Sequence, residues 1–151
     1  MRSGLCALLL ATLAGCPPQS GDGYGTYYPP GDVNPGASGC HQDSDCTPDV
    51  CARDGECLGL AQVRHIQLTW TITGAAASDT TCTAHPDFEV QFSSDQTGDG
   101  IGFAPVPCNE GKFTIDKMPD RFTNASIDDA SGNVYVSGPF DGSGNASFDL
   151  P

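Results

Sequence analysis

Positive charge is scarce in this sequence. Of its 151 residues, 6 are Lys or Arg and 19 are Asp or Glu, so the formal net charge is -13 at pH 7. A chain this acidic repels the phosphate backbone of nucleic acids and the anionic surface of membranes. We therefore expect no nucleic-acid partner and no membrane attachment through charge. Solubility is a sufficient reason for the acidity, which also favours cationic partners or divalent ions.

Catalytic motifs are also lacking. The sequence contains no G-x-S-x-G nucleophile elbow, no H-E-x-x-H helix and no phosphate-binding loop. Its three histidines, His41, His65 and His85, are scattered along the chain. We therefore expect a protein that is not an enzyme. The alternative is a hydrolase whose site residues meet only in the fold, and replacing all three histidines together would distinguish the two.

Long apolar runs are limited to the N-terminus, and no stretch carries a helical stripe of useful length. Arg2 is followed by an apolar core at residues 5–12, which is too short to span a bilayer. A positive start, a short apolar core and small residues after it are typical of an export signal. We expect a signal peptide at residues 1–15.

A cysteine closes this signal, in the run Leu13-Ala14-Gly15-Cys16. The run resembles the lipobox of bacterial lipoproteins. The resemblance implies cleavage before Cys16, a diacylglycerol on its thiol and a further acyl chain, such as palmitate, on its new amine. Pro17 favours the outer membrane by resemblance to the enterobacterial sorting rule, and the leaflet stays open. An ordinary secretory signal cut near Ala14 is the alternative.

Residues 16–39 follow, and they are rich in proline and glycine. Almost no aliphatic side chain occurs among them, so little apolar surface is available to offset the entropy cost of ordering the backbone. We expect a disordered tether that carries the lipidated Cys16 at one end and the folded part of the chain at the other.

Six cysteines remain after the signal and the lipid site are set aside, which is an even number that favours disulfides. Four of them form the pattern C-x5-C-x4-C-x5-C in a segment rich in Asp and Gly, and we expect a disulfide-bonded module at residues 40–60. Four cysteines allow three pairings. We expect the pairing that is common in small modules of this spacing, in which Cys40 bonds to Cys51 and Cys46 bonds to Cys57. The sequence alone does not exclude the others.

A zinc site is the alternative use of these four cysteines, but the C-x2-C spacing typical of zinc sites is absent and an exported protein meets an oxidising environment. The pattern resembles the short cysteine-rich repeats that follow the tether in many predicted bacterial surface lipoproteins, and more distantly the cysteine-rich part of Dickkopf-like proteins. The resemblance implies a recognition or spacer module without catalytic residues.

Period-two alternation begins at residue 63. Ile66, Leu68 and Trp70 fall on one face of a half-buried strand, and polar residues fall on the other. Six further short strands are expected around residues 88–92, 101–103, 113–115, 123–127, 134–136 and 148–150. The pattern predicts a mostly β protein whose residues 63–151 form one seven-stranded antiparallel β-sandwich. Cys82 and Cys108 are expected to form a third disulfide within it.

One stretch of this region resembles a known family. Gly111 opens the run Gly-Lys-Phe-Thr-Ile-Asp-Lys-Met-Pro, which Arg121-Phe122 and the turn Asp129-Ala130-Ser131-Gly132 follow. This arrangement resembles the carboxypeptidase-regulatory or transthyretin-like sandwiches, although Arg-Phe stands where that family often has Gly-Tyr. The resemblance implies a non-enzymatic module used for display, adhesion or carbohydrate contact.

Metal binding has one weak candidate. Asp95, Thr97 and Asp99, followed by Gly100, resemble the start of a calcium loop, but Val106 stands at the twelfth place, where a bidentate acid is needed. An ordinary hairpin turn explains the same residues, so we expect no metal or other cofactor. The alternative is a calcium-dependent ligand-binding module.

Together these patterns predict a lipid-anchored, non-enzymatic lipoprotein of the cell envelope. Its partners would be the membrane, through its lipid, and an envelope or extracellular protein or carbohydrate, through its sandwich.

Overall fold

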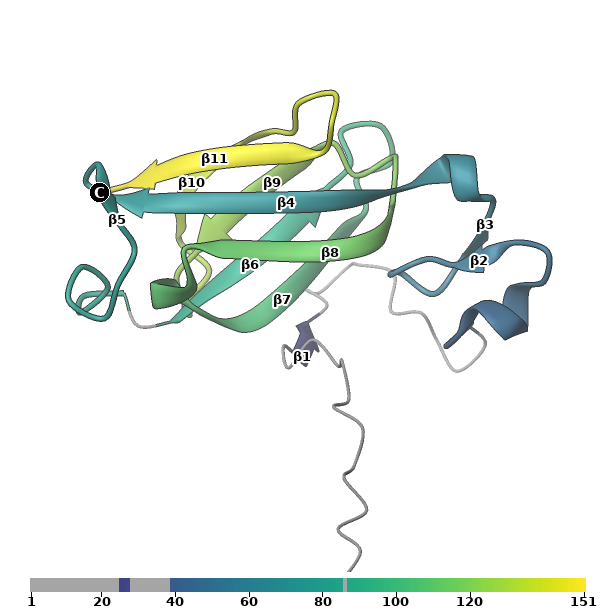
Figure 1. Cartoon of the computed structure of the whole chain (residues 1–151), viewed down its shortest axis with the longest axis horizontal. Helices are drawn as coiled ribbons and strands as arrows, with labels where there is room; N and C mark the ends of the chain where they lie inside the picture. The colour runs from purple at the N-terminus through teal and green to yellow at the C-terminus, as the bar shows by residue number, and fades with distance from the viewer. Residues whose placement is uncertain (1–24, 28–38, 86) are drawn as a thin grey trace, which may run out of the picture.

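The structure is a computed structural model that describes residues 25–27, 39–85 and 87–151. The predicted signal at residues 1–15, the lipidation site Cys16 and most of the tether lie outside the described residues. Figure 1 shows a small cysteine-rich module beside one end of a larger body of strands. The predicted mostly β fold, with disulfides in its N-terminal module, is confirmed.

The cysteine-rich module contains only short elements. They are the 3-10 helix η1 (Asp43–Cys46), the strands β2 (Val50–Cys51) and β3 (Cys57–Leu58), and the 3-10 helix η2 (Leu60–Gln62). β2 and β3 form a two-stranded antiparallel ribbon in which Cys51 lies opposite Cys57. The buried hydrophobic residues of this segment are Cys46, Val50 and Ala52. Such a small core cannot by itself offset the entropy of folding, so cross-links are needed.

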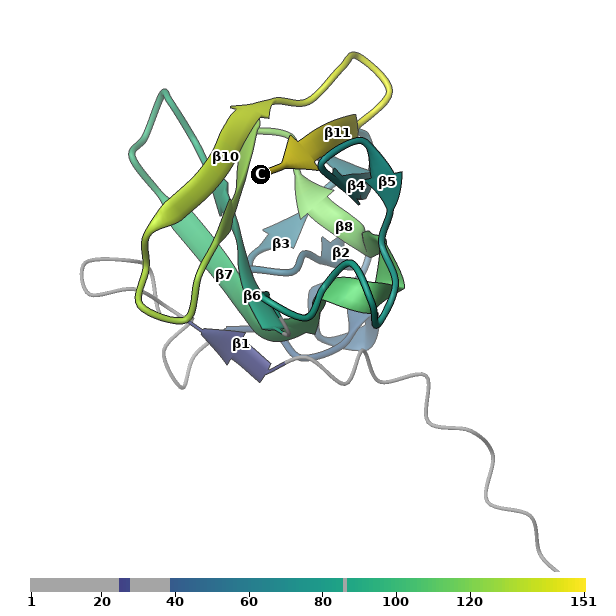
Figure 2. The same ribbon diagram turned by 90° about the vertical axis from the view of Figure 1, so that its left-hand side faces the viewer.

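Two sheets packed face to face form the rest of the fold (Figure 2). The first sheet has the strand order β1-β7-β6-β9-β10, and in the second β4 pairs with β11, β8 and β5. The bounds are β1 (Gly25–Tyr27), β4 (Val63–Ile72), β5 (Ala75–Ala76), β6 (Asp87–Ser93), β7 (Gly100–Pro107), the 3-10 helix η3 (Cys108–Glu110), β8 (Lys112–Pro119), β9 (Asn124–Asp128), β10 (Val134–Pro139) and β11 (Asn145–Leu150).

The alternation of apolar and polar residues along the strands explains which side chains form the core. Each of the seven expected segments lies within or overlaps one of the strands β4, β6, β7, β8, β9, β10 and β11. Along β4, Ile66, Leu68 and Trp70 are buried, as are Val90 and Phe92 along β6. These side chains meet between the sheets in one hydrophobic cluster. The indole Nε1 of Trp70 donates a hydrogen bond of 2.7 Å to the carbonyl of Cys108, so its one polar group is satisfied inside the core.

Two details differ from the predicted architecture. β11 pairs with β4 in parallel, with Asn145 opposite Gln67 and Leu150 opposite Ile72, whereas the other strand pairs are antiparallel. The connection from β10 to β11 passes from the first sheet to the second, which allows β11 to arrive in either direction. Gly25–Tyr27, within the predicted tether, forms β1 and pairs with β7, because backbone groups along a sheet edge pair without apolar side chains.

Within the described residues, no helix has the length and apolar character that crossing a bilayer would require.

Candidate functional site

Three disulfides fix the cysteines of the described chain. Cys40 pairs with Cys51, Cys46 with Cys57 and Cys82 with Cys108, at Cα separations of 5.7, 5.2 and 5.7 Å. These are the three pairs expected from the sequence. The Sγ atoms of Cys40, Cys46 and Cys57 lie within 4.8 Å of one another because two disulfides are adjacent. Sulfur atoms bonded in this way are not the thiolates that a zinc ion requires.

The aspartates of the module shape its turns. Asp45 Oδ2 accepts hydrogen bonds from the backbone N–H groups of His41 and Gln42 at 3.0 and 3.2 Å. Asp43 Oδ1 accepts one from the N–H of Cys51 at 3.1 Å. The hydrogen bond from His41 is the largest cause that lowers the pKa of the Asp45 carboxyl. These carboxylates therefore replace backbone pairing in a segment with little regular structure.

A bulge in β8 directs two side chains toward the module and β4. Arg64 pairs with Met118 and Ile66 with Ile115, so His65 alone lies opposite two residues of β8. Those two are Asp116 and Lys117, and Lys117 has a left-handed φ of 57°. A positive φ is uncommon for a lysine, and the bulge is what requires it.

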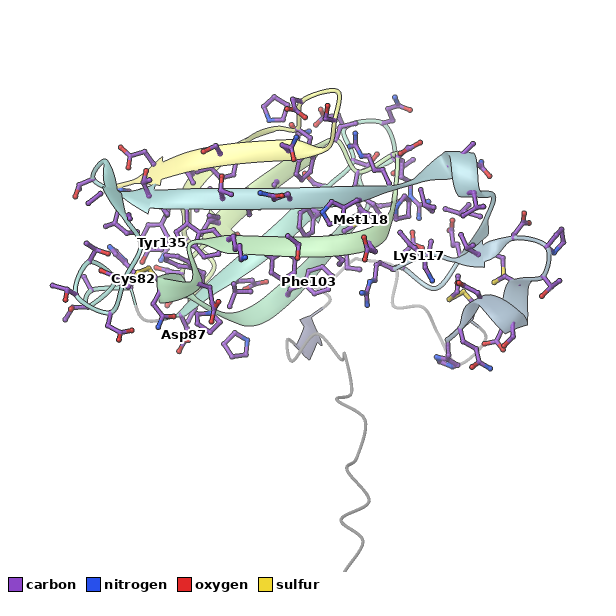
Figure 3. All side chains as sticks on the ribbon, in the orientation of Figure 1. Cys82, Asp87, Phe103, Lys117, Met118 and Tyr135 are labelled. Atoms are coloured by element: carbon purple, nitrogen blue, oxygen red, sulfur yellow. A yellow bond between two sulfur atoms is a disulfide. The ribbon has the colours of Figure 1, made fainter. Side chains whose placement is uncertain are left out.

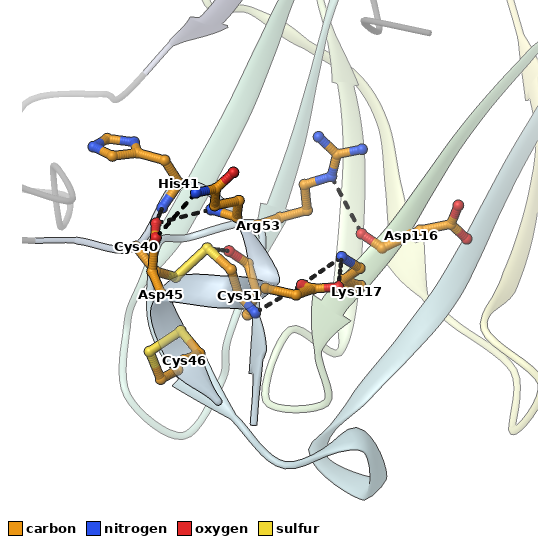
Figure 4. Close-up of polar contacts among 12 residues, drawn as sticks. Cys40, His41, Asp45, Cys46, Cys51, Arg53, Asp116 and Lys117 are labelled. Carbon is orange, nitrogen blue, oxygen red and sulfur yellow. Dashed lines mark hydrogen bonds and ion pairs between the residues drawn. A yellow bond between two sulfur atoms is a disulfide. The ribbon is translucent and has the colours of Figure 1, made fainter. Parts of the chain in front are cut away.

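The bulged residues make specific contacts. Lys117 Nζ lies 2.7 and 2.9 Å from the two carboxylate oxygens of Asp43, and this lysine is the main cause that lowers the pKa of the Asp43 carboxyl. His65 Nδ1 lies 2.6 Å from Asp116 Oδ1. The Arg53 backbone N–H donates to the Lys117 carbonyl at 3.1 Å, and its Nε donates to the Asp116 carbonyl at 3.2 Å. Figure 4 shows Arg53, Asp116 and Lys117 between the sandwich and the module.

Arg121 forms a second connection between the two parts. Its guanidinium contacts Asp54 and lies 3.0 Å from Glu56 Oε2, both in the module, and its Nε lies 3.3 Å from Asp99 Oδ2 in the β6–β7 turn. The same group lies 5.2 Å from the ring centroid of Phe122. Burial raises the pKa of Asp54, and the Arg121 charge opposes that rise. One arginine thus neutralises carboxylates from two segments that are distant in the sequence.

A groove lies between the module and β8, and we call it the junction groove. It has a volume of about 350 Å³ and is lined by residues 40–43, 51–53 and 55 of the module together with Asp116 and Lys117 of β8. Its walls carry both charges and hydrogen-bonding groups.

The structure does not bring the three predicted histidines together. His41 lies in the module and His65 on β4, while His85 precedes β6 and its Nδ1 lies 3.0 Å from the hydroxyl of Tyr135. Within the described residues, no serine, threonine or cysteine side chain is hydrogen-bonded to any of the three rings.

The weak calcium candidates form a protein-bonded turn. Asp95 Oδ2 accepts from Asn124 Nδ2 at 2.7 Å, and Thr97 Oγ1 donates to Asp99 Oδ2 at 2.7 Å. Asp99 is also the carboxylate beside Arg121. Protein donors therefore bind one carboxylate oxygen of each of these two aspartates in the turn between β6 and β7.

Sequence reasoning missed Lys117 and Arg121 as joining residues. In the sequence, Lys117 is one position of a strand pattern, and Arg121 is the residue at which a family motif is not matched. A usable signal was present, since basic residues are few and the module is acidic, so each basic residue of the sandwich was a natural partner for the module.

Comparison of the chain with protein-family models, with curated proteins and with solved structures found no match. The resemblances to lipoproteins, to cysteine-rich repeats and to carboxypeptidase-regulatory sandwiches therefore stay predictions.

Proposed function

We propose that the protein is a lipid-anchored, non-enzymatic lipoprotein of the cell envelope that presents a disulfide-stabilised β-sandwich for binding or adhesion. One observation carries the proposal: all six cysteines that follow Cys16 form disulfides within the folded part. Disulfides persist in oxidising compartments, so this pairing supports export. Cys16 ends the predicted signal and has no partner among those six cysteines, which leaves its thiol for a lipid.

The anchor follows from the energy of lipid burial. Each buried methylene contributes about 0.8 kcal/mol, and stable attachment takes more than one acyl chain. A cysteine with a diacylglycerol on its thiol and an acyl chain on its amine meets that requirement. The favoured location is the outer membrane.

Presentation is supported by the way the module is joined to the sandwich. Lys117 and Arg121 link the two parts through Asp43, Asp54 and Glu56. A partner would therefore meet one continuous surface, with the junction groove between its two parts. An envelope or extracellular protein, or a carbohydrate, is the class of partner that this surface suits.

The test compares the full-length protein with Cys16→Ser in a Gram-negative host, by membrane fractionation and intact mass. Cys6→Ser is the matched control, because it removes a cysteine within the predicted signal and leaves the lipid site. We expect wild type and Cys6→Ser in the membrane fraction with added acyl mass, and Cys16→Ser without either. A soluble, unmodified wild type would refute the anchor.

A further inference from the structure

Two acidic residues lie side by side on the outer face of the first sheet. Glu89 of β6 is directly opposite Asp128 of β9. Their neighbours Val90 and Ile127 belong to the hydrophobic core. Because side chains alternate along a strand, Glu89 and Asp128 lie on the face that points away from the core. Residues directly opposite on adjacent strands have neighbouring side chains on the same face.

Both acids are buried although they lie on an outer face. Glu89 is 8% exposed and Asp128 is 3% exposed. Gln91 Nε2 donates to Glu89 Oε1 at 3.1 Å. Asp128 Oδ1 is buried and has no hydrogen-bond partner in the described part of the chain. Ionised carboxylates are rarely buried without a cation or a full set of donors.

Within the described residues, neither acid has a basic partner. Arg64 pairs with Asp120, Lys117 with Asp43, and Arg121 with acids of the module and the β6–β7 turn. Burial is the first cause that raises the pKa of both Glu89 and Asp128, and the negative charge of Asp128 raises that of Glu89 further. The pair is thus short of positive charge in the described structure.

A groove opens beside Glu89, which is the member of the pair that lines it, and we call it the carboxylate groove. Its volume is about 500 Å³, and its lining includes Glu89, Gln91, Ala104, Pro105 and the loop at residues 130–132. Asp87 also lines it, and Figure 3 shows Asp87 at the opposite end of the sandwich from Lys117. The carboxylate groove is therefore separate from the junction groove.

We infer that the carboxylate groove binds a cationic side chain, arginine or lysine, of a partner polypeptide. Glu89 supplies an acceptor in the groove lining, and the neighbouring Asp128 adds negative charge beside it. The apolar walls from Ala104 and Pro105 suit the methylene stem that such side chains bury while their charge meets an acid. The inference rests on the proposed binding function and names the chemistry of its partner.

A divalent metal ion fits these observations less well. Calcium takes about 6–8 oxygen ligands, whereas the buried pair offers two carboxylates. The groove is also far larger than one ion needs, and its walls are partly apolar. A cationic peptide side chain matches both the negative charge and the volume of the carboxylate groove.

The test measures binding of a dye-labelled peptide, Gly-Gly-Arg-Gly-Gly, to the full-length protein by fluorescence anisotropy. The reference probe has citrulline in place of arginine, which keeps the shape and removes the charge. We expect the arginine peptide to bind at least about tenfold more tightly than the citrulline peptide. Glu89→Gln should remove most of that difference, and Asp128→Asn a smaller part of it, because Asp128 acts through its charge beside Glu89. Glu110→Gln, at an exposed acid of η3, should leave it unchanged.

Three outcomes would overturn the inference: equal binding of the two peptides, unchanged arginine binding by Glu89→Gln, or an increase in melting temperature with Ca²⁺ that Glu89→Gln abolishes. The last would make the pair a metal site. The melting temperature of each variant shows that it is folded, so a loss of binding is not a loss of structure. A failure here, with acyl mass on Cys16 retained, would leave the proposed anchor intact.

Discussion

The two ends of the sandwich differ in whether a buried carboxylate has a basic partner. At the end beside the module, Asp54 is 7% exposed and contacts Arg121. At the far end, Glu89 and Asp128 are about as deeply buried and have no basic partner among the described residues. The chain has only 6 basic residues, and its structure places Lys117 and Arg121 where two parts of the fold must be held together.

We interpret this difference as a structural role for the buried acid at one end and as support for the proposed binding role at the other. A buried acid with a cation holds a fold together, and removing one partner leaves an uncompensated charge. A buried acid without a cation costs stability, which proteins tolerate most often where a ligand is bound. Opposite stability effects of mutations at the two ends are therefore expected.

The largest effect is expected from the disulfides of the module. Replacing Cys46 and Cys57 with alanine should cost about 3 kcal/mol, because the bond closes a short loop and little apolar core is present to compensate. Limited proteolysis with mass spectrometry should show cleavage within residues 40–60 while the sandwich stays intact. The control replaces Cys82 and Cys108, where the hydrophobic core should keep the sandwich folded. Cleavage of the sandwich in the module variant would show that the two parts unfold together.

Arg121→Ala is expected to have the next largest effect. It should lower the free energy of unfolding by roughly 2 kcal/mol at neutral pH, because Asp54 stays buried without its partly exposed cation. Urea unfolding measures the change. Adding Asp54→Asn to the same variant should recover more than half of the loss, because the uncompensated charge is then gone. No recovery would mean that Arg121 acts through packing on Phe122 instead.

At the far end, neutralising an acid should stabilise the fold. Glu89→Gln and Asp128→Asn should each raise the free energy of unfolding at neutral pH by on the order of 1 kcal/mol, because burial penalises the ionised carboxylate and the neutral amide avoids that cost. A fall of similar size in both variants would show that the ionised pair is structural, in contrast to the comparison drawn above.

The raised pKa values of Glu89 and Asp128 also predict how the stability of the fold changes with pH. Because the folded-state pKa of Glu89 and Asp128 is raised, the folded chain binds more protons than the unfolded chain above their ordinary values of 4.5 and 3.8. Their contribution to stability therefore falls as pH rises through the raised values. Thermal unfolding at several pH values should show wild type gaining stability on mild acidification, and Glu89→Gln should show a smaller gain.

The smallest effect is expected from Lys117→Ala. Its ion pair with Asp43 is largely solvent-exposed, so the loss in unfolding free energy should be close to zero. Hydrogen exchange of the module should nevertheless increase more than for Lys112→Ala, a change at an exposed lysine of the same strand. Equal exchange in the two variants would mean that Lys117 does not help to hold the module.

Much of the fold was predictable because apolar side chains alternate in its strands. Ile66, Leu68 and Trp70 identify β4 from the sequence alone, and the spacing of the cysteines identifies the module. The parallel pairing of β11 with β4 was not predictable in this way. Alternation tells which face of a strand is buried, but the neighbour and direction depend on contacts between distant segments.

The sites were less predictable than the fold. Glu89 and Asp128 occupy outward positions, where a polar residue is ordinarily solvated, and only the register of β6 with β9 places them together. Lys117 faces the module because a bulge shifts the alternation by one residue, and no residue type in β8 marks that bulge. The weak calcium candidates followed a recognisable motif, yet their oxygens bind protein donors.

The parallel pairing of β4 with β11 also bears on the timing of folding. Thr71 and Asp149, which are hydrogen-bonded across this pair, are 78 positions apart in the chain. A ribosome therefore releases β4 long before the strand that completes its sheet, and such long-range pairing makes folding slow. For a chain exported as proposed here, this delay keeps the sandwich open during synthesis, so the polypeptide can cross a membrane before it closes.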